Sequence, residues 1–123
     1  MPLTRKLVGI GIDSVAWDRM RRFLAAHSFE SLKRLLVSSE QKTFQGTPEP
    51  LRFFARCFAA KEAYFKASGG SWMEGEAGFL KIEVVMKGKN RFTIRNRFQT
   101  EGKFFDIQDG IAAQVLIWEQ SDQ

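Results

Sequence analysis

Glu62 and Lys66 are the residues whose types and spacing are best suited to chemistry in this sequence. They stand four positions apart in a stretch that is otherwise rich in alanine and phenylalanine. On a helix this spacing places both side chains on one face. Ala55 and Ala59 fall on the same face and leave room for a ligand beside the two charges. The simpler interpretation is a solvated ion pair, worth about 0.3–0.5 kcal/mol.

Asp13 is a second carboxylate suited to join this pair. It closes an apolar run, Leu-Val-Gly-Ile-Gly-Ile-Asp, whose valine and isoleucines favour a strand. A helix packed on that strand would bring Glu62 towards Asp13. Two carboxylates suit Mg²⁺, a hard cation that binds proteins through one or two carboxylates together with phosphate oxygens and water. Lys66, one turn away, would then stabilise phosphate charge or help to remove a hydroxyl proton, which serves phosphoryl transfer.

The composition limits what else the chain can do. Nineteen Lys and Arg against fourteen Asp and Glu give a formal charge of +5, which favours an anionic partner. The same predicted helix carries Arg52 and Arg56 on an adjoining face, where they could meet phosphate.

The single cysteine, Cys57, excludes an internal disulfide and fits a buried position in a reducing compartment. The single histidine, His27, excludes sites that need several histidines and is expected to be solvated or capping.

These residues need elements to position them, and the most secure is a helix over Leu51–Ala67, which lacks Gly, Pro and β-branched residues. Ser68, Gly69, Gly70 and Ser71 should end it. We predict an α+β fold in one domain, residues 1–123, with this long helix packed on a small antiparallel sheet. The other expected elements are a strand Leu7–Asp13, helices Trp17–Ala26 and Phe29–Leu36, a turn at Glu40 capped by Ser38 or Ser39, a loop Gly46–Pro50, and strands near Phe79–Met86, Arg91–Phe98, Lys103–Ile107 and Ile111–Glu119.

Two blocks of the sequence resemble the signature blocks of the phosphopantetheinyl transferase superfamily. The first is Gly-Ile-Gly-Ile-Asp ending at Asp13, with Arg19 six residues later. The second is Phe-Ala-Ala-Lys-Glu-Ala-Tyr-Phe-Lys-Ala, which ends at Ala67. Order, spacing and length are most similar to the short stand-alone class, the holo-acyl-carrier-protein synthases, over most of the chain.

The resemblance implies a phosphopantetheinyl transferase-like fold and Mg²⁺-dependent transfer of 4'-phosphopantetheine from coenzyme A to a serine of an acyl carrier protein. It makes Asp13 and Glu62 metal ligands, and it makes Lys66 catalytic together with Glu62. Coenzyme A would be bound by Arg56, Lys61 and Gly69, and the carrier protein by Arg19, Arg21 and Arg22. The family's short members form homotrimers with sites between subunits, so a trimer is implied, acting in the cytoplasm in fatty acid biosynthesis or a related pathway.

Four positions depart from the family pattern. Ala16 stands where a glutamate is usual, and Cys57 stands where the family has an arginine near the coenzyme phosphates. Ser71 replaces a glycine after the helix, with Gly70 shifted by one. The segment 105–110, Phe-Asp-Ile-Gln-Asp-Gly, lacks the Ser-x-Ser-His expected before the last strand. A diverged binder of coenzyme A or carrier protein, without turnover, is therefore the alternative function.

A third interpretation is a basic nucleic-acid module. It rests on the net charge and on arginines that alternate with aromatic residues in the segment 91–98. The same alternation is typical of a strand with one packed and one solvated face, which is the interpretation we adopt. For this reason we do not expect a nucleic-acid partner. We do not expect a membrane partner either, because no apolar run approaches the roughly 20 residues that a bilayer requires.

Overall fold

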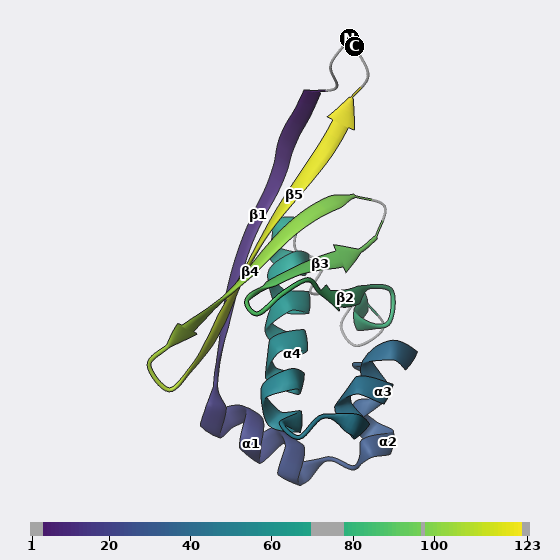
Figure 1. The fold of residues 1–123 in the computed structure, drawn as a ribbon, viewed down its shortest axis with the longest axis vertical. Coiled ribbons are helices and arrows are strands. Elements are labelled where there is room, and N and C mark those ends of the chain that lie inside the picture. Colours follow the sequence, from purple (N-terminus) through teal and green to yellow (C-terminus); the bar gives the residue numbers. More distant parts are fainter. Residues whose placement is uncertain (1–3, 70–77, 97, 122–123) are drawn as a thin grey trace.

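The computed structural model describes residues 4–69, 78–96 and 98–121 of the chain. Its helices and strands are labelled in Figure 1. In chain order they are β1 (Thr4–Ala16), α1 (Trp17–Ala26), α2 (Phe29–Leu32), α3 (Ser38–Gly46), α4 (Pro50–Ala67), β2 (Glu83–Met86), β3 (Arg91–Arg95), β4 (Gln99–Ile107) and β5 (Gly110–Ser121).

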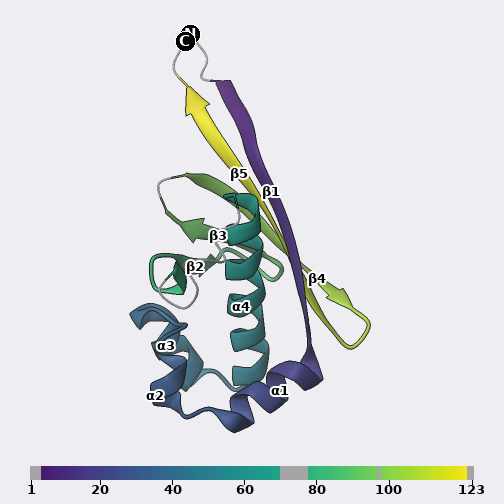
Figure 2. The same ribbon diagram turned by 180° about the vertical axis from the view of Figure 1, so that it is seen from behind.

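The strands form one antiparallel sheet in the order β1-β5-β4-β3-β2, and α4 lies across one of its faces (Figures 1 and 2). The shorter helices α1, α2 and α3 gather near the end of α4 that begins at Pro50. This arrangement confirms the predicted α+β fold with a long helix on a small antiparallel sheet. No helix in the described ranges is long and apolar enough to cross a membrane.

The long helix has the expected bounds, with Pro50 added at its first turn. Proline suits this position because the helix leaves its first backbone N–H groups without internal partners. At the other end, the backbone N–H of Ser68 donates to the Tyr64 carbonyl at 2.9 Å. Gly69 follows with φ of 105°, a left-handed conformation that glycine adopts readily. Gly70 and Ser71, also expected to end the helix, lie outside the described residues.

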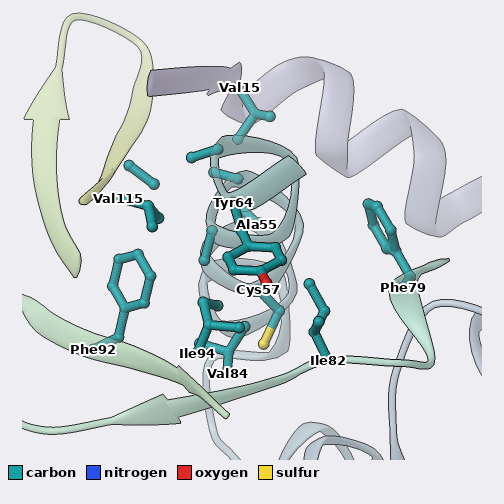
Figure 3. Close-up of a cluster of buried hydrophobic side chains, with 14 of the residues drawn as sticks. Val15, Ala55, Cys57, Tyr64, Phe79, Ile82, Val84, Phe92, Ile94 and Val115 are labelled. Carbon is teal, nitrogen blue, oxygen red and sulfur yellow. The ribbon is translucent and has the colours of Figure 1, made fainter. Parts of the chain in front are cut away.

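The core fills the space between α4 and the sheet. Figure 3 shows Tyr64 and Cys57 of α4 among side chains of β2, β3 and β5, including Val84, Ile94 and Val115. Cys57 is fully buried, as expected, and burial raises the pKa of its thiol well above the ordinary value. On β3 the residues alternate between a buried Phe92 and Ile94 and exposed arginines, as the packed-face interpretation predicted, while Arg97 lies outside the described residues.

β1 and α4 approach so closely that only glycine fits on the strand. A Cβ atom added to Gly11 would lie 2.0 Å from the carbonyl oxygen of Ala63, and one added to Gly9 would lie 1.9 Å from that of Ala67. Ala63 and Ala67 are one helical turn apart, so each small residue on the helix faces one glycine on the strand. The Gly-x-Gly pattern near the start of the chain therefore has a packing role.

Several elements differ from the predicted bounds. β1 extends to Ala16, so Asp13 lies within the strand, because residues 4–6 and 14–16, on either side of the apolar run, also pair with β5. Gly102 was expected to separate two strands, but it lies inside β4, where the Phe92 ring packs against its backbone. β2 begins only at Glu83, and α2 ends at Leu32.

The start of α3 also differs from the prediction. The helix begins at Ser38, and the preceding residue, Val37, is its N-cap. Neither Ser38 nor Ser39 caps it. The carboxylate of Glu40 instead accepts a hydrogen bond from the Val37 backbone N–H at 2.9 Å. The physical reason is that Glu40 is buried, so its oxygens need donors from the protein.

Candidate active site

Asp13 and Lys66 meet at the contact between β1 and α4. Side chains alternate along a strand, so Asp13 shares the helix-facing side of β1 with Gly9 and Gly11. The Lys66 Nζ atom donates to Asp13 Oδ1 at 2.8 Å and to the Ile12 carbonyl at 3.3 Å. The Asp13 side chain is 17% exposed and that of Lys66 is 54% exposed. The site is thus open to solvent on the lysine side.

Glu62 stands one turn before Lys66 and is half-buried. Burial raises the pKa of its carboxyl group above the ordinary value, and repulsion by Asp13 adds to the shift. The positive charges of Lys66 and Arg19 oppose it. The two carboxylates therefore repel each other at the site, and an additional cation would relieve that repulsion.

The donor set of this site matches Mg²⁺ better than a transition metal. Within residues 4–69, 78–96 and 98–121 there is no group of three or more His, Cys, Asp and Glu side chains able to hold a metal ion. Mg²⁺ needs only one or two protein carboxylates, since substrate phosphates and water complete its shell. Asp13 and Glu62 fit that requirement.

The arginines expected to meet a partner lie on α1, which follows β1 directly. Arg19, Arg21 and Arg22 are exposed, and Arg21 forms an ion pair with Asp18 of the same helix. The N-terminus of α1 is tied to the β4–β5 turn, because the Trp17 backbone N–H donates to the Asp109 carbonyl at 2.9 Å. The positive charge of Arg19 on this helix opposes the rise in the pKa of the Glu62 carboxyl group.

Arg56 lies in the first half of α4, six residues before Glu62, which is about 9 Å along the helix axis. Its guanidinium group donates to the Lys89 carbonyl at 2.9 Å and to Asn90 Oδ1 at 3.2 Å, and it lies 4.8 Å from the centre of the Phe104 ring. Burial lowers its pKa, and the nearby charge of Arg52 adds to the shift.

Arg52 and Arg56 both line a cavity of about 180 Å³, together with Thr47, Glu49, Phe53 and Met86. Like charges one turn apart on a helix destabilise it, and neither arginine has a salt bridge among the described residues. The cavity is therefore a suitable place for an anionic group.

Lys61 was expected to bind a cofactor, and the structure corrects this. Its side chain is 0% exposed. All three ammonium hydrogens are used inside the protein, by the Leu35 carbonyl, the Phe79 carbonyl and the Glu40 carboxylate. The ammonium group has neither the exposure nor a donor left for a ligand.

Glu40 is the partner that sequence reasoning missed. The signal was present, because Lys61 shares a helix face with Cys57 and Tyr64, four residues before it and three after it. A lysine on a buried face requires an acceptor. Gly69, the other expected cofactor residue of this region, is exposed, and no heavy atom of the residues that the structure describes lies within 4 Å of the place a Cβ would take.

Together the fold and the site define a class: an α+β domain in which a strand and a long helix converge on a carboxylate pair beside a lysine. A family model described as the 4'-phosphopantetheinyl transferase superfamily matches residues 9–116, and the chain belongs to this superfamily.

Similarities to individual proteins agree with this family assignment. The chain is 38% identical over 89 residues to the holo-(acyl-carrier-protein) synthase of Blochmanniella floridana, covering 72% of this chain and 70% of that protein. It is 44% identical over 61 residues to the synthase of Aromatoleum aromaticum, a match that spans about half of the length of each. The crystal structure of a Bacillus anthracis holo-(acyl-carrier-protein) synthase in complex with CoA (3',5'-ADP) has a TM-score of 0.76 and 29% identity, covering 92% of this chain and 97% of that one.

Proposed function

We propose that the protein transfers 4'-phosphopantetheine from coenzyme A to a serine of an acyl carrier protein, with Mg²⁺. The observation that carries this proposal is the contact between Asp13 and Lys66 beside Glu62, in a chain of this superfamily. The names of the related synthases and the coenzyme in the Bacillus anthracis structure support the choice of donor and acceptor.

In the proposed reaction the carrier serine oxygen attacks the phosphorus atom that bears the pantetheine arm. A new P–O bond forms, the bond to the bridging oxygen breaks, and adenosine 3',5'-bisphosphate leaves while the serine loses its proton. Asp13 and Glu62 would hold Mg²⁺, which neutralises pyrophosphate charge when bound. Lys66, in reach of Asp13, would stabilise the charge on the transferred group as an ammonium, or would receive the serine proton after it has first released one of its own protons to solvent.

The cavity lined by Arg52 and Arg56 would bind another phosphate of coenzyme A. Cys57 is buried and cannot take the role of the family's arginine, so the neighbouring Arg56 would serve in its place. Gly69, at the other end of the helix, would let backbone approach the coenzyme. Lys61 is buried and would have no part in binding coenzyme A.

The exposed arginines of α1 would bind the acidic carrier protein. Arg19 is the one whose charge already acts at the site, so a carrier bound on α1 would bring its serine towards Glu62 and Lys66. Arg21 and Arg22 extend the same basic surface. Such charges act chiefly on association rate and orientation.

The sheet face away from α4 supports a homotrimer. Ile10 and Ile12 of β1, and Phe105 of β4, alternate with residues that face the helix and are 57%, 55% and 45% exposed. Apolar groups collected on one face are typical of an interface. We also assign the protein to the cytoplasm, where a single buried thiol such as Cys57 stays reduced, and to fatty acid biosynthesis.

The test incubates the protein with coenzyme A, Mg²⁺ and an apo acyl carrier protein and measures the mass of the carrier. We expect the mass to rise by one phosphopantetheine arm. Glu62→Gln should abolish the transfer, while the exposed Glu30→Gln should not change it. A carrier whose mass stays unchanged with several apo carrier proteins would contradict the proposal.

A catalytically impaired binder is the second candidate. It is favoured by Ala16, by the buried Cys57 and by the segment 105–110, which has no histidine. In that case the chain binds coenzyme A or carrier protein by calorimetry, yet the carrier gains no mass. Binding with turnover supports the first function, and binding without turnover supports this one.

A further inference from the structure

The buried ion pair of Lys61 and Glu40 is the strongest polar feature of the chain that the proposed reaction does not use. The two side chains are 0% and 1% exposed, and Lys61 Nζ lies 2.7 Å from Glu40 Oε1. The same ammonium donates to the carbonyl oxygens of Leu35 and Phe79, each at 2.9 Å. Each of its three hydrogens therefore has an acceptor.

The carboxylate of Glu40 extends the connection to two more segments. Its Oε1 atom accepts from the Val37 backbone N–H at 2.9 Å, and its Oε2 atom accepts from the Val84 backbone N–H at 2.7 Å. The ion pair thus ties the middle of α4 to the residues before α3 and to the start of β2. Segments distant in sequence are joined at one buried point.

Burying two charges is a weak way to gain stability. The cost of removing both groups from water often cancels their attraction, and replacement by apolar side chains of similar volume is often neutral or stabilising. The hydrogen bonds do have a definite geometry, which apolar contacts lack. We therefore expect the Lys61–Glu40 ion pair to contribute to the orientation of α4 more than to the stability of the fold.

Glu62 lies between two fixed neighbours on α4. Lys61 is held by the buried ion pair, and Ala63 is fully buried, with its carbonyl in the close contact to Gly11. Consecutive residues point about 100° apart around a helix. With a fixed residue on each side of Glu62, α4 cannot turn about its axis without breaking one of the two contacts.

We propose that the Lys61–Glu40 ion pair sets the rotation of α4 so that Glu62 faces Asp13. Lys61 and Glu40 are then positioning residues for the metal site, acting through the helix without contact with metal or substrate. This inference rests on the proposed function, in which Asp13 and Glu62 hold the divalent cation.

The experiment compares metal affinity and stability in a double variant, Lys61→Met with Glu40→Leu. Mn²⁺ serves as the probe, with its affinity measured by calorimetry and its environment by electron paramagnetic resonance, without coenzyme or carrier. We expect the thermal midpoint to fall, because the Val37 and Val84 N–H groups and the Leu35 and Phe79 carbonyls lose their partners. In the protein that remains folded we expect Mn²⁺ affinity to fall about 10- to 100-fold, as is usual when residues that orient metal ligands are lost. The matched control is the exposed pair Lys33→Met with Glu30→Leu, which should change neither quantity.

The outcomes separate this inference from the proposed function. If the unchanged chain binds no Mn²⁺, or if Glu62→Gln binds it equally well, the metal site itself is wrong. If the unchanged chain binds Mn²⁺ through Glu62 and the folded double variant binds it with affinity within twofold, the positioning role is overturned.

A milder variant keeps the inference testable if the double variant does not fold. In Glu40→Gln the amide oxygen can still accept from Lys61 and the Val37 N–H, but the amide nitrogen meets the Val84 N–H, which is also a donor. We expect a smaller loss of Mn²⁺ affinity in the same direction. An affinity equal to that of the unchanged chain would contradict the positioning role.

Discussion

Glu62 illustrates how a proposed metal ligand costs stability. Its carboxyl group is half-buried beside Asp13, and both burial and that neighbour raise its pKa. The folded chain then binds a proton at Glu62 more tightly than the unfolded chain does. The stabilising effect of the protonated group is fully present below its unfolded pKa, about 4.3, and is lost as the pH rises through the higher folded value.

Replacing Glu62 by glutamine should therefore stabilise the metal-free protein at neutral pH. The neutral amide does not repel Asp13 and does not require a charge to be partly buried. The difference in free energy of unfolding between Glu62→Gln and the unchanged chain should shrink as the pH falls from the raised folded pKa towards the unfolded value, and it should be lost below about 4, where both side chains are neutral. Urea unfolding at several pH values, with a chelator present, measures it. A difference that does not depend on pH would contradict this account of Glu62.

At the scale of residues, helix spacing predicted that Glu62 and Lys66 share a face, and the strand-like run predicted that Asp13 could join them. The structure places Asp13 and Lys66 in contact, while their roles stay predictions. Lys61 was misassigned, because it belongs to the signature block but lies on the buried face of α4. Only the folded chain shows that Glu40, 21 residues earlier, is its partner.

At the scale of elements, the site depends on how closely β1 approaches α4. The two glycines of β1 allow the strand backbone to lie against the carbonyl groups of Ala63 and Ala67. Because Asp13 is on the same strand and Lys66 on the same helix, this approach sets the distance across which they meet. A bulky residue on either element would separate them.

Gly11→Ala should destabilise the chain and weaken the site together. The added Cβ would lie 2.0 Å from a backbone oxygen, which can move only if the strand or the helix moves. Overpacking of this kind costs about 1–3 kcal/mol or more. Urea unfolding measures the loss, and Gly88→Ala is the control, because no heavy atom in the described part of the chain lies within 4 Å of its added Cβ. Equal stabilities of the two variants would show that the close approach is not required.

Sequence reasoning identified the elements better than the ends of the strands. The bounds of α1 matched, and those of α4 differed by one residue, because helical periodicity and breakers are local signals. The bounds of β1, β2 and β4 were less accurate, because strand ends are decided by the partner strand. Gly102 shows this, since its place inside β4 follows from the Phe92 ring that packs on it.

At the scale of the whole molecule, the sheet has one face covered by α4 and one face with exposed isoleucines on its edge strand β1. If the chain forms a trimer through this face, a charge placed there should separate the subunits. Burial of a charge without a partner costs several kcal/mol, which exceeds what one apolar contact contributes.

We expect Ile10→Glu to shift the protein from trimer to monomer, as measured by analytical ultracentrifugation. The control is Leu80→Glu, since Leu80 is 47% exposed but does not lie on a strand of the sheet. A trimer that persists in Ile10→Glu, or a monomer in the unchanged chain, would argue against this face as the interface.

The hydrogen bond from the Trp17 backbone N–H to the Asp109 carbonyl joins the first residue of α1 to the tip of the β4–β5 hairpin. Asp109 holds a φ of 62°, which is uncommon for a residue with a side chain and is maintained by its surroundings. Amides in the first turn of a helix usually exchange rapidly with deuterium, because they have no internal acceptor. The Trp17 amide should instead exchange as slowly as those of the strands, and it would report in solution whether the basic helix and the hairpin open together.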